Sequence, residues 1–106
     1  MKFSHHPVRF IVIVYICLHS AFLFALDVPP LNGPVNDYAR MFTESETQEL
    51  NTYLYTIDRN SDLQIAVLTI PSLEGENLED YSIRVAEKWQ IGQKGKDSGI
   101  ILVIAA

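Results

Sequence analysis

Histidine and cysteine are almost absent from this chain of 106 residues, and their positions restrict its chemistry. The histidines are His5, His6 and His19, and the single cysteine is Cys17, so none occurs after residue 19. Histidine acid–base catalysis, histidine-ligated zinc and a cysteine nucleophile are therefore excluded for the rest of the chain. An internal disulfide is excluded as well, because it needs two cysteines.

Basic residues are also scarce beyond the N-terminal segment. All 13 Asp and Glu lie from Asp27 onward, against six Lys and Arg, so this part has a formal charge of −7. Binding to nucleic acid needs a basic face that neutralises phosphates, so we expect no nucleic-acid partner. An acidic surplus is typical of a soluble protein, and it also suits a protein that holds a hard cation.

Residues 1–26 have the layout of an export signal. Lys2 and Arg9 give it a positive start, residues 10–26 are almost wholly apolar, and small residues follow at Ala21 and Ala25. A cleaved signal peptide is one interpretation. The other is an uncleaved anchor through which residues 10–26 contact the membrane, spanning about 26 Å as a helix. Either way we expect an N-terminal hydrophobic helix and an exported protein, which is periplasmic, extracellular, or membrane-anchored and facing outward.

A linker and one domain follow this leader. Residues 27–32 contain Pro29 and Pro30, which lack backbone donors and favour extended chain, so we assign them to the linker. Residues 33–106 carry the alternating helix and strand pattern of a single α/β domain.

The first helix and the first strand of this domain are clearly marked. Thr43 and Glu46 have the spacing of a capping box, and apolar residues recur at helical spacing after it. Tyr53 lies on the apolar stripe, so we expect its ring to point inward. Residues 63–70 are apolar but for two positions, which predicts a mostly buried strand.

A second helix begins after Asn77, which we expect to be its N-cap. Its apolar stripe ends at Trp89, which we interpret as a core anchor, whereas Arg84 and Lys88 fall on the solvent side. Gly92 follows in a position suited to a left-handed cap.

Residues 100–106 are seven consecutive apolar residues behind Gly99, which predicts a strand buried on both faces inside a parallel sheet. With the strand at 63–70 and the second helix, it makes a βαβ unit. The predicted fold class is therefore α/β, a βαβ-based parallel sheet flanked by helices. Because two such strands would leave both sheet edges unpaired, we expect the terminal strand to seek a partner.

Carboxylates are the remaining candidates for chemistry. Asp37 and Asp97 stand in extended or turn segments beside apolar residues, and two such groups on one spot would suit Ca²⁺ or Mg²⁺. The alternative is structural: residues 97–99 are an ordinary turn, and Asp37 caps residues 38–41. Residues 92–99 superficially match a phosphate loop but leave a helix and enter a strand, so we interpret them as a surface loop.

Several short motifs, in this order and spacing, make residues 31–106 resemble the TPM domain family. They are Gly33-x-Val35-x-Asp37, the helix with Leu50 and Leu54, residues 64–67 and 73–75, Tyr81 through Trp89-x-Ile91-Gly92, and Asp97-x-Gly99-Ile100 with the apolar strand after it. The resemblance implies an exported or membrane-tethered α/β domain, with calcium at an acidic cluster whose matching positions here are Asp37 and Asp97. It also implies a domain that continues past residue 106, so we expect this chain to be C-terminally truncated.

Three functions are compatible with this resemblance. The first is an accessory or interaction domain for a membrane-associated protein partner, because family members include photosystem-repair and receptor-accessory proteins. The second is a metal-assisted acid phosphatase, in which a cation on Asp37 and Asp97 would clamp phosphate oxygens. The third is a truncated fragment without activity.

Overall fold

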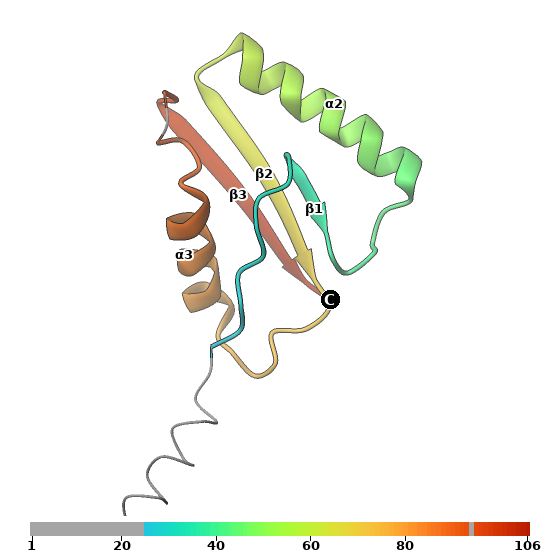
Figure 1. The fold of residues 1–106 in the computed structure, drawn as a ribbon, viewed down its shortest axis with the longest axis vertical. Coiled ribbons are helices and arrows are strands. Elements are labelled where there is room, and N and C mark those ends of the chain that lie inside the picture. The colour runs from blue at the N-terminus through green and yellow to red at the C-terminus, as the bar shows by residue number, and fades with distance from the viewer. Residues whose placement is uncertain (1–24, 94) are drawn as a thin grey trace, which may run out of the picture.

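A computed structural model describes residues 25–93 and 95–106 of the chain. They form an α/β fold, a parallel three-stranded sheet flanked by two helices (Figure 1), which confirms the predicted class. In chain order the elements are β1 (Val35–Asp37), α2 (Glu44–Asn60), β2 (Leu63–Ile70), α3 (Leu78–Trp89) and β3 (Ser98–Ala105). The predicted N-terminal hydrophobic helix lies outside the described residues.

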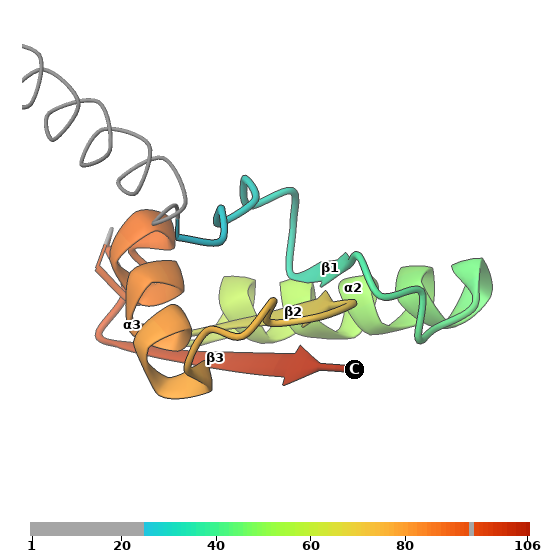
Figure 2. The ribbon, with the colours of Figure 1, turned by 90° about the horizontal axis from the view of Figure 1, so that it is seen from below.

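The strand order is β1-β2-β3, so β2 occupies the centre. β1 pairs with β2 from Val35 against Val67, and β2 pairs with β3 along all eight residues, from Leu63 against Ser98. Two sequence predictions need correction. β1 was expected only as extended chain, and β3 was expected inside the sheet but lies at an edge of the described sheet (Figure 2).

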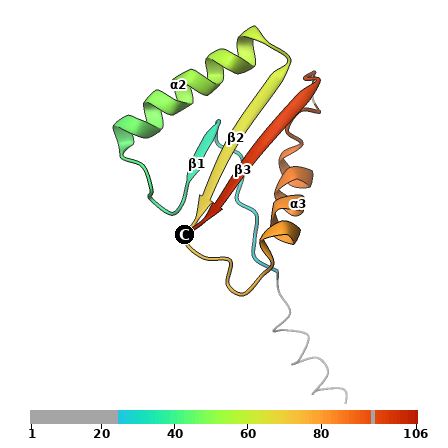
Figure 3. The same ribbon diagram turned by 180° about the vertical axis from the view of Figure 1, so that it is seen from behind.

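The two helices lie on opposite faces of the sheet. This arrangement follows from β2, whose alternate residues point to opposite faces and contact different helices. Leu68 packs in one core cluster with Val85 and Trp89 of α3, whereas Val67 packs in another with Leu54 of α2. Seen from the front and from behind, α2 lies beside β1 and α3 beside β3 (Figure 1, Figure 3). Among the residues that the structure describes, no helix covers the face of β3 that points away from α3.

α2 starts as its sequence predicts, since Thr43 and Glu46 form both bonds of the capping box. The prediction that Tyr53 points inward is wrong, because this residue is 65 % exposed. The physical reason is the narrow sheet beneath the helix. β1 has only three residues, so the sheet covers Leu50, Leu54 and Ile57 of α2 but does not reach Tyr53 at the edge of the apolar stripe.

α3 is capped by Asn77, whose side chain accepts from the Asp80 amide, and Trp89 is a buried core residue as predicted. The left-handed cap is Gln90 with a φ of 52°, not Gly92. Gly92, with a φ of +78°, has another role. A Cβ there would lie 2.5 Å from the backbone nitrogen of Gly99. The chain after α3 therefore passes the start of β3 at a distance that only glycine permits.

No helix among residues 25–93 and 95–106 is long and apolar enough to cross a membrane.

Candidate functional site

Asp37 ends β1 and organises the corner that leads toward α2. Its Oδ1 accepts hydrogen bonds from the amide of Met41 at 3.0 Å and from the Thr69 hydroxyl at 2.5 Å. Its Oδ2 accepts from the amide of Phe42 at 2.9 Å. Thr69, directly across the sheet in β2, also accepts from the Ala39 amide at 3.0 Å. One carboxylate therefore fixes the turn and joins it to β2, which matches the capping alternative for Asp37.

These contacts also set the charge state of Asp37. Partial burial raises the pKa of its carboxyl group, but the hydrogen bonds from Thr69, Met41 and Phe42 outweigh this effect. The pKa of Asp37 therefore lies below its ordinary value, and the ionised form is favoured. Its oxygens already accept from three donors, which leaves little capacity for a metal ion.

Asp97 lies at the other end of the sheet. It immediately precedes β3, whose first residue Ser98 pairs with Leu63 at the start of β2, whereas Asp37 pairs with Thr69 near the end of β2. Six residues of strand separate these levels, or about 20 Å at the usual rise. The structure therefore does not bring Asp37 and Asp97 together, and the geometry gives no support to one cation held by both. Within the described ranges, no group of three or more His, Cys, Asp or Glu could hold a metal ion.

The outer side of β3 is the largest set of backbone groups without a partner strand in the described part of the chain. The Ser98 amide donates to the Asp62 carbonyl and the Ala106 amide to the Ile70 carbonyl, each at 3.0 Å. Successive residues of a strand point their backbone groups to alternate sides. The even-numbered amides therefore face β2, and those of Ile101, Val103 and Ala105 face outward.

Apolar side chains flank this open edge on both faces of the sheet. Ile100 and Leu102 are 52 % and 51 % exposed on the face that α2 leaves uncovered. On the other face, a groove between α3 and β3 is lined by Ile83, Ile101 and Val103. No charged residue or proline, which are common protections of an edge strand, occurs from residue 98 to 105.

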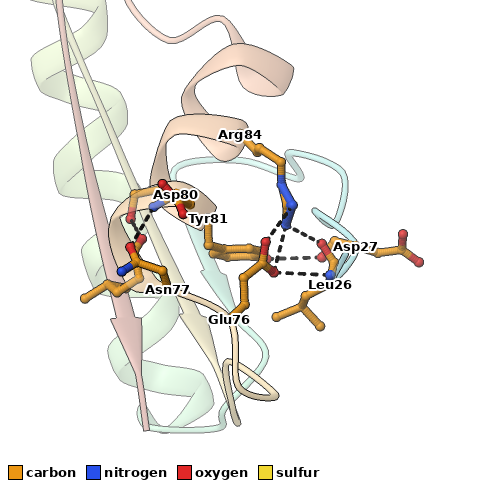
Figure 4. Close-up of polar contacts among 9 residues, drawn as sticks. Leu26, Asp27, Glu76, Asn77, Asp80, Tyr81 and Arg84 are labelled. Atoms are coloured by element: carbon orange, nitrogen blue, oxygen red, sulfur yellow. Dashed lines mark hydrogen bonds and ion pairs between the residues drawn. The ribbon is translucent and has the colours of Figure 1, made fainter. Parts of the chain in front are cut away.

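The second notable arrangement is a clamp on residues 26–29, which we call the N-terminal strap. Four consecutive backbone carbonyls of the strap accept hydrogen bonds from side chains of α3 (Figure 4 shows two of them). The donors and distances are Arg84 to Leu26 at 2.7 Å, Tyr81 to Asp27 at 3.1 Å, Lys88 to Val28 at 2.6 Å and Trp89 to Pro29 at 2.8 Å. The strap is thus fixed along its whole length.

Glu76 completes the clamp just before α3. Its Oε2 accepts from the Leu26 amide at 3.2 Å, and both of its oxygens pair with the Arg84 guanidinium at 2.7 and 3.0 Å. The strap also contributes Leu26 and Val28 to the core cluster under α3. Burial raises the pKa of the Tyr81 phenol above its ordinary value, which favours the protonated, donating form further.

Sequence reasoning missed this clamp. The helical spacing predicted that Arg84 and Lys88 lie on the solvent side. Trp89 was interpreted only as an apolar core ring, without a role for its indole N–H. The clamp joins groups 50 or more positions apart in the chain, such as Leu26 and Glu76, which no local pattern reveals. A usable signal was the set of long donors on α3 at positions 81, 84 and 88, which share one helix face.

Comparison with known proteins shows which protein family the chain matches. A family model described as the TPM domain matches residues 35–106, which is more than half of the chain and includes every strand and helix described above. None of the curated proteins compared with the chain matches it.

Proposed function

This chain belongs to the TPM domain family, and we propose that it acts outside the cytoplasm as an interaction module, with β3 accepting an extended apolar segment of a membrane-associated protein as an additional strand. The observation that carries the proposal is the outer edge of β3, which has no partner strand among residues 25–93 and 95–106. Ile101, Val103 and Ala105 present outward donors and acceptors in a row, as strand addition requires.

The chemistry of the edge defines the segment it would accept. Ile100 and Leu102 on one face, with Ile101 and Val103 on the other, offer apolar contacts to alternate side chains of an incoming strand. The absence of charge on β3 favours a segment rich in valine, isoleucine and leucine. The export signal predicted for residues 1–26 supports a partner at or outside the membrane.

Residue-resolved amide exchange on the full chain tests this proposal. In the free protein, the amides of Ile100, Leu102 and Ile104 should exchange slowly because they bind β2, whereas those of Ile101, Val103 and Ala105 should exchange fast. A synthetic peptide rich in valine, isoleucine and leucine, the segment that the edge favours, should then slow exchange of the second set. Slow exchange of both sets in a free monomer would refute the proposal, and so would a peptide that leaves the second set unprotected.

A charged variant provides the control. Leu102→Lys should abolish peptide protection while changing stability little, because the side chain is half exposed and a lysine on an edge disfavours strand addition. Tyr53→Lys places the same charge on an exposed position of α2 and should leave peptide protection intact. Equal protection in both variants would contradict the assignment to β3. Self-association of the wild type that Leu102→Lys removes would identify a second copy as the occupant and overturn the choice of partner.

The described residues supply no arrangement that favours the phosphatase alternative. Asp37 is committed to three structural hydrogen bonds, and Asp97 lies at the opposite end of the sheet. Cation binding by these residues stays a prediction of the family resemblance alone.

A further inference from the structure

The N-terminal strap is anchored from its first backbone atom by a charged group. The first strap atom held is the nitrogen of Leu26, and its acceptor is the carboxylate of Glu76. Ala25, immediately before it, is exposed. Within the described residues, a small exposed residue therefore directly precedes the held strap, one position before the end of the leader predicted from the sequence.

Glu76 pairs with Arg84 and also accepts from the Leu26 amide, so the acceptor of the strap nitrogen is a charged group. A neutral acceptor would satisfy the single N–H of Leu26, whereas a carboxylate binds an ammonium group with roughly twice the strength of a neutral pair. Arg84 contacts both oxygens of Glu76 and also holds the Leu26 carbonyl, so the carboxylate is fixed toward the Leu26 nitrogen (Figure 4). One carboxylate oxygen, shared with Arg84, is therefore already in position at the nitrogen that a cleavage before Leu26 would make a chain terminus.

We propose that Glu76, oriented by Arg84, is a binding site for the α-ammonium group that is created when the leader is cleaved between Ala25 and Leu26. The cleavage is a hydrolysis by an export endopeptidase of the host. Water adds its hydroxyl to the Ala25 carbonyl carbon, the C–N bond breaks, and the Leu26 nitrogen takes up the proton of that water and a second proton, which is balanced by the one that the new Ala25 carboxyl group releases. The new ammonium group then forms an ion pair with Glu76 where the amide formed a hydrogen bond.

The remaining strap contacts explain why the terminus would stay in place. Tyr81, Lys88 and Trp89 hold the next three carbonyls, and Val28 packs against the core under α3. The strap therefore stays seated without the leader. The proposal rests on the predicted export signal and not on partner binding at β3, so either can fail without the other.

The first test needs no variant. The full chain, expressed with its leader in an exporting bacterial host, should yield a product whose intact mass and N-terminal sequence begin at Leu26. A product that begins at any other residue, or one that keeps residues 1–25, would overturn the proposal.

The second test measures the bound terminus itself. In the exported product, pH titration by NMR should give the Leu26 α-amino group a higher pKa in the wild type than in Glu76→Gln, because the ionised carboxylate favours the charged amine. Glu79→Gln removes an exposed charge from the first turn of α3 and should leave that pKa as in the wild type. Identical titration in the wild type and Glu76→Gln would contradict a terminus bound at Glu76, even if cleavage occurs at the expected bond.

Discussion

Replacing Asp37 by asparagine should lower the free energy of unfolding by about 1–3 kcal/mol at pH 7, the usual cost of leaving a donor unsatisfied. Asparagine keeps one oxygen, which can still serve Met41 or Thr69. Its amide group, however, replaces the oxygen that accepts from Phe42, so two donors face each other at a contact of 2.9 Å. For a domain of this size, each kcal/mol corresponds to a fall in melting temperature of about 4–8 °C.

The effect should depend on pH in a defined direction. Partial burial raises the pKa of Asp37, but the bonds from Thr69, Met41 and Phe42 lower it more, so the folded pKa lies below the ordinary value of 3.8. A carboxyl group with a depressed pKa contributes stability that is fully present above its unfolded pKa and is lost as the pH falls through the folded pKa. The gap between wild type and Asp37→Asn should therefore be constant above about pH 5 and shrink below the ordinary value.

Thermal unfolding followed by circular dichroism, at pH 7 and at pH 3, measures both effects. Asp97→Asn is the matched control, because Asp97 is exposed and should change stability by no more than about 0.5 kcal/mol. Wild-type stability of Asp37→Asn at pH 7 would refute the structural role of this carboxylate. Stabilisation of the wild type by Ca²⁺ that both variants abolish would show that the two aspartates share a cation.

Three further substitutions test the way the chain is held together. Gly92→Ala should destabilise the domain by about 1–3 kcal/mol because an alanine is strained in this left-handed backbone conformation, and by more because its Cβ clashes with Gly99. A free energy of urea unfolding equal to that of the wild type would contradict the close approach of the two glycines. Trp89→Phe keeps most of the buried ring but loses the bond to Pro29, so denaturant unfolding should show a loss of about 1 kcal/mol, and no loss would argue against the strap contact. Lys96→Met removes the donor to the carbonyls of Asp58 and Ser61 at the end of α2, so the free energy of unfolding obtained from thermal melts should fall by about 1 kcal/mol. An unchanged free energy would mean that the contact contributes nothing.

Local chemistry made part of this structure predictable. Thr43 and Glu46 reveal the start of α2 because a capping box joins positions three residues apart. Asn77 reveals the start of α3 as an N-cap residue, and mostly apolar runs reveal β2 and β3. β1 escaped detection because its three residues carry no period of their own, and only the remote pairing with β2 makes them a strand.

The arrangement of the candidate residues Asp37 and Asp97 was not predictable from the sequence. The sequence identifies Asp37 and Asp97 as acidic residues at element boundaries, yet the parallel register of the sheet decides that they lie at opposite ends. Likewise, the apolar run of β3 predicted burial on both faces, whereas its edge position leaves Ile100 and Leu102 half exposed.

The sequence by itself determined the α/β class, the N-caps of both helices and the membership of the TPM domain family, because each depends on neighbouring residues or on their order. The tertiary structure decided where the chain has an open edge and how its first described residues are held. A free strand edge and a clamp between Leu26 and Glu76 are relations between segments far apart in sequence. Only folding, which brings those segments into contact, creates them.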